Sequence, residues 1–503
     1  MGSRSMWGIP EFPDVEQIGA GDLSKLAPDL IVVGAYGKEG SDLDLPDDFK
    51  EPLLEIIQGV DLAEKPGSSN QITVKSAEHG KNVTFAAFIL GPEKSCDSSS
   101  FLKLGTFAAK TASTKKSVNE VCLILPPTTS NLHATAALEG IFLGAYKDNR
   151  WRTEKKAPSR CAESVYLSSQ VKLDIASIRC VCEGIIFTRQ LVNAPPNVLK
   201  PAVLAQCMTE CADRYGMDIK ILEREDCEGL GMGLYLGVAQ GATSDPKFIH
   251  VKYNPPNKPV KSVALVGKGI CFDSGGYNLK TGPDSMINLM KFDMGGAATI
   301  FGAARAIAHL KIPDVEVHFI TASCENMVSG HAYRPGDVLT ASNGKTVEVV
   351  NTDAEGRMTL GDALVYADKL GVDYIVDVAT LTGSVIVGLG NEYAGLFTPH
   401  DEIASLLAKA ASDTGESLWR MPFVRAYRKL LDSSIADVKQ CHTRPGDCIN
   451  AAVMLNEFVS EETQWAHCDI AGTSWNFAEN CATGYGVRTL VSFIKGLDRS
   501  QKQ

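Results

Sequence analysis

The sequence predicts an α/β protein of two domains, a small N-terminal α/β domain and a larger C-terminal domain whose mostly parallel mixed sheet is flanked by helices. A length of 503 residues allows two or more domains of ordinary size. Short apolar runs alternate with helix-like segments, and this alternation is typical of parallel sheets covered on both faces. The apolar fraction of 44% and the charged fraction of 22% are ordinary for a globular protein.

The N-terminal domain is predicted to span residues 6–170. Its apolar, β-branched runs predict three strands, and small and apolar residues at helical spacing predict two helices between and after them. The strands are expected at 27–34, 83–91 and 121–125, and the helices at 101–112 and 133–146.

A connecting segment follows at residues 171–194, with a helix over 175–191 that ends before Pro195 and Pro196. The C-terminal domain is predicted to span 195–503. A helix begins at Pro201, and further apolar runs predict strands with a small-residue helix over 297–310 among them. These strands are expected at 219–222, 263–266, 315–321, 346–350 and 374–379.

Composition excludes several classes of protein. The net charge of −11 argues against a sequence-independent grip on nucleic acid or on an anionic membrane surface. No run approaches the roughly 18 apolar residues of a membrane span, and the N-terminus lacks the apolar core of a signal peptide. The 14 cysteines include no C-x-x-C pair and favour buried thiols in a reducing compartment, so we expect a cytoplasmic protein. His467 is expected to be a packed structural residue.

The most informative stretch of the chain is Asn351–Arg357. It lies between the predicted strand 346–350 and a predicted helix over 358–370, a kind of crossing at which open α/β sheets bind ligands. Asp353 and Glu355 are two positions apart in an irregular turn, so both can converge on one cation, and Arg357 can hold an anion beside it.

A second cluster of charged residues surrounds the predicted strand 263–266. Lys268 and Asp273 are expected in the loop after this strand, and Lys280 follows. Asp293 is expected directly before the N-terminus of the helix over 297–310.

Four carboxylates, those of Asp273, Asp293, Asp353 and Glu355, would repel one another in one pocket. Either they are scattered, or divalent cations such as Mg, Mn or Zn neutralise them. Four is about the number that a two-metal site needs, with metals roughly 3.5–4 Å apart. One of the two lysines could be a neutral amine ligand and the other a cationic electrophile, and spacing alone does not assign them.

These motifs resemble the leucyl aminopeptidases of the M17 class. The resemblance covers nearly all of residues 190–503, whereas the N-terminal third matches only in outline. The gap between Lys280 and Asp293 is similar to that of plant and protozoan members, and Met358 stands where leucine is more usual. The matching segments are Gly267–Lys280, Asp293–Gly296, Cys324–Met327, Arg334–Asp337, Asn351–Arg357, Thr380–Gly383 and Trp465–Gly472.

The resemblance implies a metal-dependent aminopeptidase with two divalent metal ions (Zn, Mn, Mg or Co) and bicarbonate as general base. It implies that Lys280 stabilises the oxyanion and that Arg357 holds the bicarbonate; the main-chain N–H groups of Gly356 and Leu381 could complete that cradle. The tighter metal would be bound by Lys268, Asp273, Asp293 and Glu355, and the exchangeable metal by Asp273, Asp353 and Glu355.

An adaptable apolar pocket is implied for the first side chain of the peptide, so leucine and other hydrophobic residues should be preferred. Ser474 stands where mammalian members carry methionine, which leaves room for bulkier side chains. The implied lining is Met286, Met290, Phe292, Thr380, Gly383, Ile386, Ala471, Ser474 and Phe477.

Family members form homohexamers, dimers of trimers, and act on short peptides, so we expect both here. Two other functions use the same features. A dinuclear phosphoesterase would employ these carboxylates, although such sites usually include histidine ligands, which both clusters lack. A DNA-binding or chaperone role is known among family members, and the acidic charge balance disfavours DNA.

Overall fold

The computed structural model describes residues 7–9, 11–19, 22, 25–36, 47–58, 66–75, 80–153, 161–282 and 285–498. The chain divides into two compact units, residues 1–182 and 183–503, and the division falls inside helix α4 (Ile175–Asn193). The predicted start of the N-terminal domain at residue 6 lies outside the described residues. Among the described residues, no helix is long and apolar enough to cross a membrane.

The N-terminal unit contains a six-stranded sheet in the order β1-β6-β5-β2-β4-β3, in which β3 runs antiparallel to β4 and the other pairs are parallel. Helices α2 and α3 pack closely, because a Cβ on Gly105 would lie 1.9 Å from the carbonyl oxygen of Ala137. The elements are β1 (Asp14–Ile18), β2 (Leu30–Ala35), α1 (Asp47–Gln58), β3 (Ser69–Lys75), β4 (Asn82–Ile89), η4 (Glu93–Ser95), α2 (Ser98–Thr114), β5 (Glu120–Ile124), α3 (Asn131–Gly144) and β6 (Ser164–Ser168).

The C-terminal unit is built on a nine-stranded mixed sheet. Its strand order is β16-β15-β18-β14-β9-β11-β8-β7, and β10 pairs with the far half of β11. The central pairs β18–β14, β14–β9 and β9–β11 are parallel, which confirms the predicted fold class. The strands are β7 (Asp218–Leu222), β8 (Lys247–Tyr253), β9 (Lys261–Gly267), β10 (Gly269–Asp273), β11 (Val315–Asn326), β14 (Tyr374–Ala379), β15 (Ala394–Phe397), β16 (Leu418–Arg420) and β18 (Gln464–Asp469).

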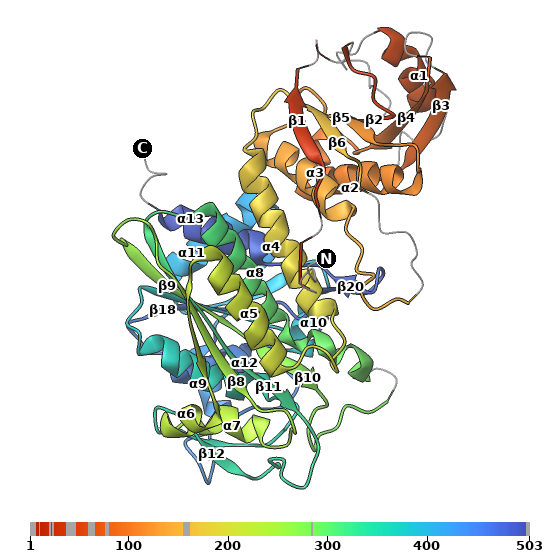
Figure 1. Ribbon diagram of the computed structural model, residues 1–503. Coiled ribbons are helices and arrows are strands. Elements are labelled where there is room, and N and C mark those ends of the chain that lie inside the picture. The colour runs from red at the N-terminus through yellow and green to blue at the C-terminus, as the bar shows by residue number, and fades with distance from the viewer. Residues whose placement is uncertain are drawn as a thin grey trace. The chain divides into compact units, whose positions relative to one another are not determined.

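Helices cover both faces of this sheet. Figure 1 shows α5, α8, α11 and α13 over one face and α7, α9 and α12 over the other. The helices are α5 (Pro201–Tyr215), α6 (Arg224–Gly229), α7 (Gly233–Ala239), η6 (Ile287–Met294), α8 (Gly295–Leu310), α9 (Gly356–Asp368), α10 (Gly383–Leu389), α11 (Asp401–Thr414), η7 (Arg425–Leu431), α12 (Asp447–Leu455), η8 (Asn456–Phe458) and α13 (Val487–Leu497). Short strands β12 (Val338–Thr340), β13 (Thr346–Glu348) and β17 (Val438–Lys439) form a second sheet, and β19 (Trp475–Asn476) pairs with β20 (Cys481–Ala482).

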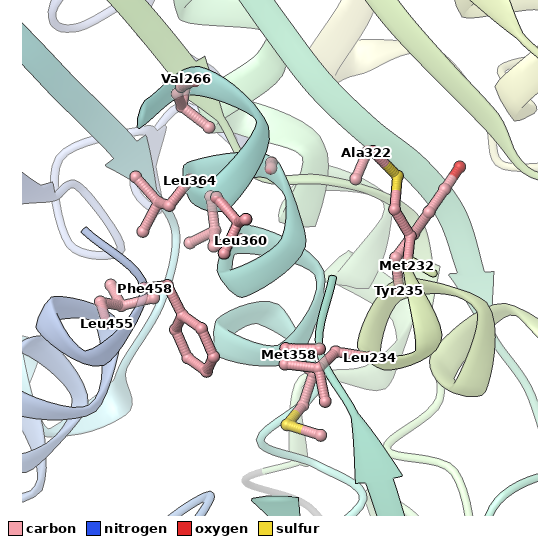
Figure 2. Packing of buried hydrophobic residues seen from close by; sticks show 14 of the residues in the cluster. Met232, Leu234, Tyr235, Val266, Ala322, Met358, Leu360, Leu364, Leu455 and Phe458 are labelled. Carbon is pink, nitrogen blue, oxygen red and sulfur yellow. The ribbon is translucent and has the colours of Figure 1, made fainter. Parts of the chain in front are cut away.

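The core under α9 fixes the helix that follows the Asn351–Arg357 motif. Met358, Leu360 and Leu364 are fully buried or nearly so and belong to one cluster with residues of α7 and η8. Figure 2 shows Leu234 of α7 beside Met358, and both Leu234 and Phe458 approach α9 at Gly361, where a Cβ would lie 3.1 Å and 3.0 Å from them. Burial of this kind stabilises by about 1.5–3 kcal/mol for each large apolar side chain, so α9 is a rigid support for the residues at its N-terminus.

One local prediction was wrong, and one predicted strand is shorter than expected. Lys268 and Asp273 do not share a loop: Lys268 is the single residue between β9 and β10, and Asp273 ends β10. Both strands pair with β11, whose 12 residues are long enough to bind β9 with one half and β10 with the other. The predicted strand 346–350 ends at Glu348 and lies in the small three-stranded sheet, because its neighbours are β12 and β17.

The predicted burial of most cysteines and the structural role predicted for His467 are confirmed. Eleven of the fourteen cysteines are buried, and burial raises the pKa of the Cys122 and Cys271 thiols to about 12. His467 is fully buried in β18, where its Nδ1 lies 2.5 Å from Asp377 Oδ1, and Trp465 Nε1 donates to the other oxygen of Asp377. His467 is therefore a packed structural residue.

Candidate functional site

The charged residues predicted from the sequence meet at the carboxyl ends of the parallel strands. Lys268 follows β9, Asp273 ends β10, Asp293 lies in η6 directly before α8, and Glu355 directly precedes α9. The carboxyl ends of parallel strands share one edge of the sheet, and open α/β sheets bind their ligands at that edge. This is why residues far apart in the sequence can meet here.

Lys268 joins two of the carboxylates. Its Nζ lies 2.9 Å from Asp293 Oδ1 and 2.8 Å from Glu355 Oε1, and it donates to the Thr380 carbonyl at 3.0 Å. Three acceptors match the three N–H bonds of an ammonium group. Glycine after Glu355 leaves room for this side chain, because a Cβ on Gly356 would lie 2.7 Å from Lys268 Nζ and would force it to shift.

Lys280 joins the other two. Its Nζ lies 2.9 Å from Asp273 Oδ2 and 2.5 Å from Asp353 Oδ1. The loop that carries Lys280 turns through Gly275, whose φ of +86° favours glycine and whose Cβ would come within 2.9 Å of Asp353 Oδ1. The loop can therefore approach the Asp353 carboxylate closely.

The carboxylates fit a divalent metal centre. Asp273, Asp293 and Glu355 each offer an oxygen, and these oxygens lie within 4.8 Å of one another. Within the described residues, Asp293 Oδ2 and Glu355 Oε2 are buried and have no hydrogen-bond partner. A buried, unpartnered carboxylate oxygen is costly, and coordination of a cation would remove that cost.

Burial and the repulsion between neighbouring carboxylates also shift the pKa values of these groups. Burial, with the Glu355 charge next, raises the pKa of Asp273 to about 7, and burial raises the pKa of Asp293 and Asp353 as well. Burial would also raise the pKa of Glu355, but Lys268 and Lys280 outweigh it and the net shift is downward. Like charges crowded into a buried pocket resist ionising together, and a divalent cation would relieve that resistance.

Both lysines are ammonium groups in this arrangement. Burial alone would lower the pKa of Lys268 and Lys280, but nearby carboxylates reverse the effect, led by Asp293 for Lys268 and by Asp273 for Lys280, and both pKa values rise. An ammonium group has no lone pair, so Lys268 would have to lose its proton to ligate a metal.

Supporting residues that the sequence did not reveal orient the carboxylates. Asn326, at the end of β11, donates to Asp273 Oδ1 at 2.7 Å and to the Thr352 carbonyl at 2.9 Å. The Tyr333 hydroxyl donates to the same carbonyl, and the Thr380 hydroxyl donates to Asp293 Oδ1 at 2.8 Å. The signal available for Asn326 and Tyr333 was their place in or near the segments Cys324–Met327 and Arg334–Asp337.

Arg357 lies in the first turn of α9, with 3% of its surface exposed. Its Nη1 donates to the Gln440 carbonyl at 3.3 Å, and its Nη2 lies 3.4 Å from Asp447 Oδ1. Among the described residues, its buried Nε has no hydrogen-bond partner. A buried guanidinium with an unused N–H fits an oxyanion. The Leu381 N–H donates to Asp469 Oδ1 at 3.1 Å, so an anion would have to share this donor.

The predicted pocket residues gather in part. The Cβ position at Gly295 lies 3.2 Å from Thr380 Cγ2 and 3.6 Å from Ser474 Cβ, so these side chains meet beside Asp293. Phe292 stacks on Trp475 with ring centroids 6.0 Å apart. Ile386 packs against a small cluster that contains Ala471. Of the remaining four, Met290 is buried, Met286 is partly buried, and Gly383 and Phe477 are exposed.

Residues 186–491 match the model of the cytosol aminopeptidase family, catalytic domain. The chain belongs to the cytosol aminopeptidase family. A probable cytosol aminopeptidase of Synechococcus sp. (strain CC9311) is 48% identical over 419 residues, which are 80% of this chain and 83% of that protein. Leucine aminopeptidase 1 of Arabidopsis thaliana is 43% identical over 496 residues, 94% of each chain.

A solved structure supports the same assignment. A mutant of tomato leucine aminopeptidase superposes with a TM-score of 0.86 at 38% identity, covering 97% of this chain and 98% of that one. As a member of this family the protein is an aminopeptidase, a hydrolase that depends on divalent metal ions, and its acidic cluster fits them. Family membership favours this function over the alternative of a dinuclear phosphoesterase.

Proposed function

We propose that the protein removes the N-terminal residue of short peptides, preferring leucine and other hydrophobic residues, with two divalent metal ions in each subunit. The observation that carries the proposal is the buried group of Asp273, Asp293 and Glu355, whose carboxylates each bring one oxygen within 4.8 Å of the others and of which two keep an unpartnered oxygen. The proposed metal ligands are Lys268, Asp273, Asp293, Asp353 and Glu355, and Zn, Mn, Mg or Co ions fit such a set.

The chemistry divides between the metal ions and the side chains. Bound divalent ions supply a water of lowered pKa and polarise the scissile carbonyl. The ammonium group of Lys280 lies between Asp273 and Asp353. It stabilises the negative charge that develops on the carbonyl oxygen of the substrate. Lys268 lies between Asp293 and Glu355 and, as a proposed metal ligand, would give up its proton when the metal binds.

Arg357 is proposed to hold a bicarbonate ion, which supplies a general base when bound. The unused Nε of its buried guanidinium supports this role, because arginine grips planar oxyanions through neighbouring N–H groups. The Gly356 N–H would donate a further hydrogen bond to the bicarbonate. The Leu381 N–H would divide its hydrogen bond between the bicarbonate and Asp469.

The pocket for the first side chain is proposed to include the nine residues named from the sequence. Support comes from the group formed by Thr380, Ser474 and Gly295 beside Asp293, which places small side chains next to the metal ligands. Ser474 Oγ is buried and, within the described part of the chain, has no hydrogen-bond partner. The pocket therefore accepts hydrophobic side chains, and the Ser474 hydroxyl could form a hydrogen bond with a polar side chain of the substrate.

The proposed compartment is the cytoplasm, and the proposed assembly is a homohexamer. Several relatives are named cytosol aminopeptidases, whereas one relative from Arabidopsis thaliana is named as chloroplastic.

A panel of amino-acid amides tests the substrate proposal. Leucine, methionine and phenylalanine amides should be hydrolysed faster than aspartate or glycine amides. The N-acetylated leucine amide should be inert, because it lacks the free amine that distinguishes an N-terminal residue. Hydrolysis of acetyl-leucine amide at the rate of leucine amide would contradict the proposal. So would preferred cleavage of acidic residues.

A further inference from the structure

A fifth carboxylate contacts the arginine that is proposed to bind the anion. Asp447 begins α12, directly after Gly446, whose φ of +70° turns the chain into the helix. Its Oδ1 lies 3.4 Å from Arg357 Nη2, and its Oδ2 accepts a hydrogen bond from the Ser384 hydroxyl at 3.3 Å. The mechanism proposed above does not use Asp447.

Asp447 and an external anion would share one guanidinium. Both contacts of Arg357 are long, 3.3 Å to the Gln440 carbonyl and 3.4 Å to Asp447, and its buried Nε has no partner among the described residues. The side chain of Asp447 is 25% exposed, whereas that of Arg357 is 4% exposed. An anion bound through Nε would therefore lie near the negative charge of Asp447, which contacts Nη2 of the same cation.

Charge, rather than positioning, is the main effect of this contact. Arg357 is buried in the first turn of α9 and is also held by the Gln440 carbonyl, so one contact of 3.4 Å adds little to its orientation. Repulsion between two anions a few ångströms apart at a partly buried site is much larger than such a contact, and it grows with the charge of the incoming anion.

We propose that Asp447 determines the anion specificity of Arg357: its carboxylate lowers the affinity for bicarbonate and excludes doubly charged anions such as sulfate and hydrogen phosphate. The proposal rests on the proposed role of Arg357 in binding bicarbonate. Ser384 contributes a long hydrogen bond of 3.3 Å to the other oxygen of this carboxylate, so its effect should be smaller. The enzyme would then respond to bicarbonate without being blocked by the more highly charged anions of its surroundings.

The test compares anion binding with and without the charge. Asp447→Asn keeps the shape and one acceptor oxygen and removes the charge; Ser384→Ala keeps the charge and removes its hydroxyl partner. Glu461→Gln removes one exposed negative charge elsewhere and serves as the matched control. Each protein is loaded with metal and degassed. Equilibrium dialysis with labelled bicarbonate and labelled sulfate then gives both dissociation constants, and the bicarbonate dependence of leucine amide hydrolysis is measured in parallel.

For Asp447→Asn we expect the dissociation constant for bicarbonate to fall on the order of tenfold. The constant for sulfate should fall by a larger factor, because sulfate carries two charges. Ser384→Ala should shift both constants in the same direction by less. Glu461→Gln should match the parent protein, and Arg357→Ala should bind neither anion.

Three outcomes overturn the proposal. If Asp447→Asn binds bicarbonate within twofold of the parent, or more weakly, then Asp447 does not compete with the anion, although bicarbonate binding itself stands. If bicarbonate tightens but sulfate tightens equally or less, the specificity claim is wrong. If neither the parent nor Asp447→Asn binds bicarbonate, the proposed role of Arg357 fails together with this inference.

Discussion

Lys268 and Lys280 are chemically identical side chains with different partners. Lys268 contacts Asp293 and Glu355 and is almost fully buried, whereas Lys280 contacts Asp273 and Asp353 from a loop and remains partly accessible. A residue enclosed among the metal ligands should affect metal affinity, and a residue on the accessible side should affect the transition state. The two lysines are thus separable by experiment.

Substitution of each lysine by alanine should affect a different property of the enzyme. Lys280→Ala should lower kcat by roughly 10²–10³-fold with unchanged metal content, as expected for the loss of an oxyanion partner. Lys268→Ala should instead lower the metal content, because the site loses the amine that is proposed to bind one of the metal ions. Elemental analysis and steady-state kinetics measure both effects. Lys261→Ala, which removes an exposed lysine paired with Asp373, is the control. Two full metal equivalents in Lys268→Ala would refute its assignment.

Two helical glycines provide a residue-scale test of the packing at the site. Gly356→Ala should destabilise the protein and lower its metal content, because the new Cβ would lie 2.7 Å from Lys268 Nζ. Gly496→Ala in α13 has nothing within 4 Å of its Cβ, so it should stabilise by about 0.5–1 kcal/mol. Thermal unfolding of both variants beside the parent measures the difference. Equal melting temperatures would show that the Lys268 side chain moves aside freely.

At the scale of elements, strands β8 and β11 are joined by a chain of side-chain hydrogen bonds. His250 Nε2 lies 2.8 Å from His318 Nδ1, His250 Nδ1 lies 3.0 Å from the Tyr366 hydroxyl, and His318 Nε2 lies 3.0 Å from Glu316. Burial lowers the pKa of His250 to about 4, assisted by the charges of His318, Lys220 and Lys252. Burial lowers the pKa of His318 as well.

These shifts predict a loss of stability in mild acid. The folded pKa of His250 lies below its unfolded value, so its contribution is complete above about pH 6.5 and is lost as the pH falls towards 4. The loss for His250 should be on the order of 2 kcal/mol at pH 5. His250→Gln removes the titration, so its melting temperature should fall less between pH 7 and pH 5 than that of the parent. Parallel melting curves in the two proteins would contradict this.

The predictability of elements depended on how much of their stability is local. Tyr374–Ala379 and the helix before Asn193 have continuous apolar patterns, and both were predicted closely. The role of β10 was missed, because a five-residue apolar run after a glycine does not show that it extends the pairing of β11. The strand at 346–348 was found, but its sheet partners are not encoded nearby in the sequence.

In the site, too, residues in local motifs could be predicted from the sequence, whereas contacts between distant residues could not. The carboxylates and lysines stood in two compact motifs, and their convergence followed from the parallel sheet. The contact between Arg357 and Asp447 joins residues 90 positions apart, and the contact between Asn326 and Asp273 joins residues 53 apart. Nothing in the local pattern around Asp447 or Gln440 indicates a contact with a distant arginine.

At the scale of the whole molecule, the metal ions should support both activity and stability. Prolonged treatment with a chelator should abolish leucine amide hydrolysis, and Mn, Co or Zn should restore it. Metal ions that bind only the folded state add stability, about 2.7 kcal/mol at a hundredfold excess over the dissociation constant, so the melting temperature should rise with the metal. Full turnover in a sample shown to be metal-free by elemental analysis would refute the metal dependence.

The proposed hexamer is a second property of the whole molecule. Sedimentation of the active enzyme should give a mass well above the 54.0 kDa of one chain, close to six times that value. The same sedimenting boundary should carry the aminopeptidase activity. A stable and fully active species near 54.0 kDa would exclude a required assembly.

The order of strands in the larger sheet has a consequence for biosynthesis. Strand β18, which comes last of the nine in the chain, lies between β15 and β14 in the interior of the sheet. Its final residue, Asp469, holds the loop whose Thr380 contacts both Lys268 and Asp293. During translation this loop stays without its anchor until β18 has been made and has left the ribosome. We therefore expect a nascent chain to lack aminopeptidase activity until β18 has joined the sheet.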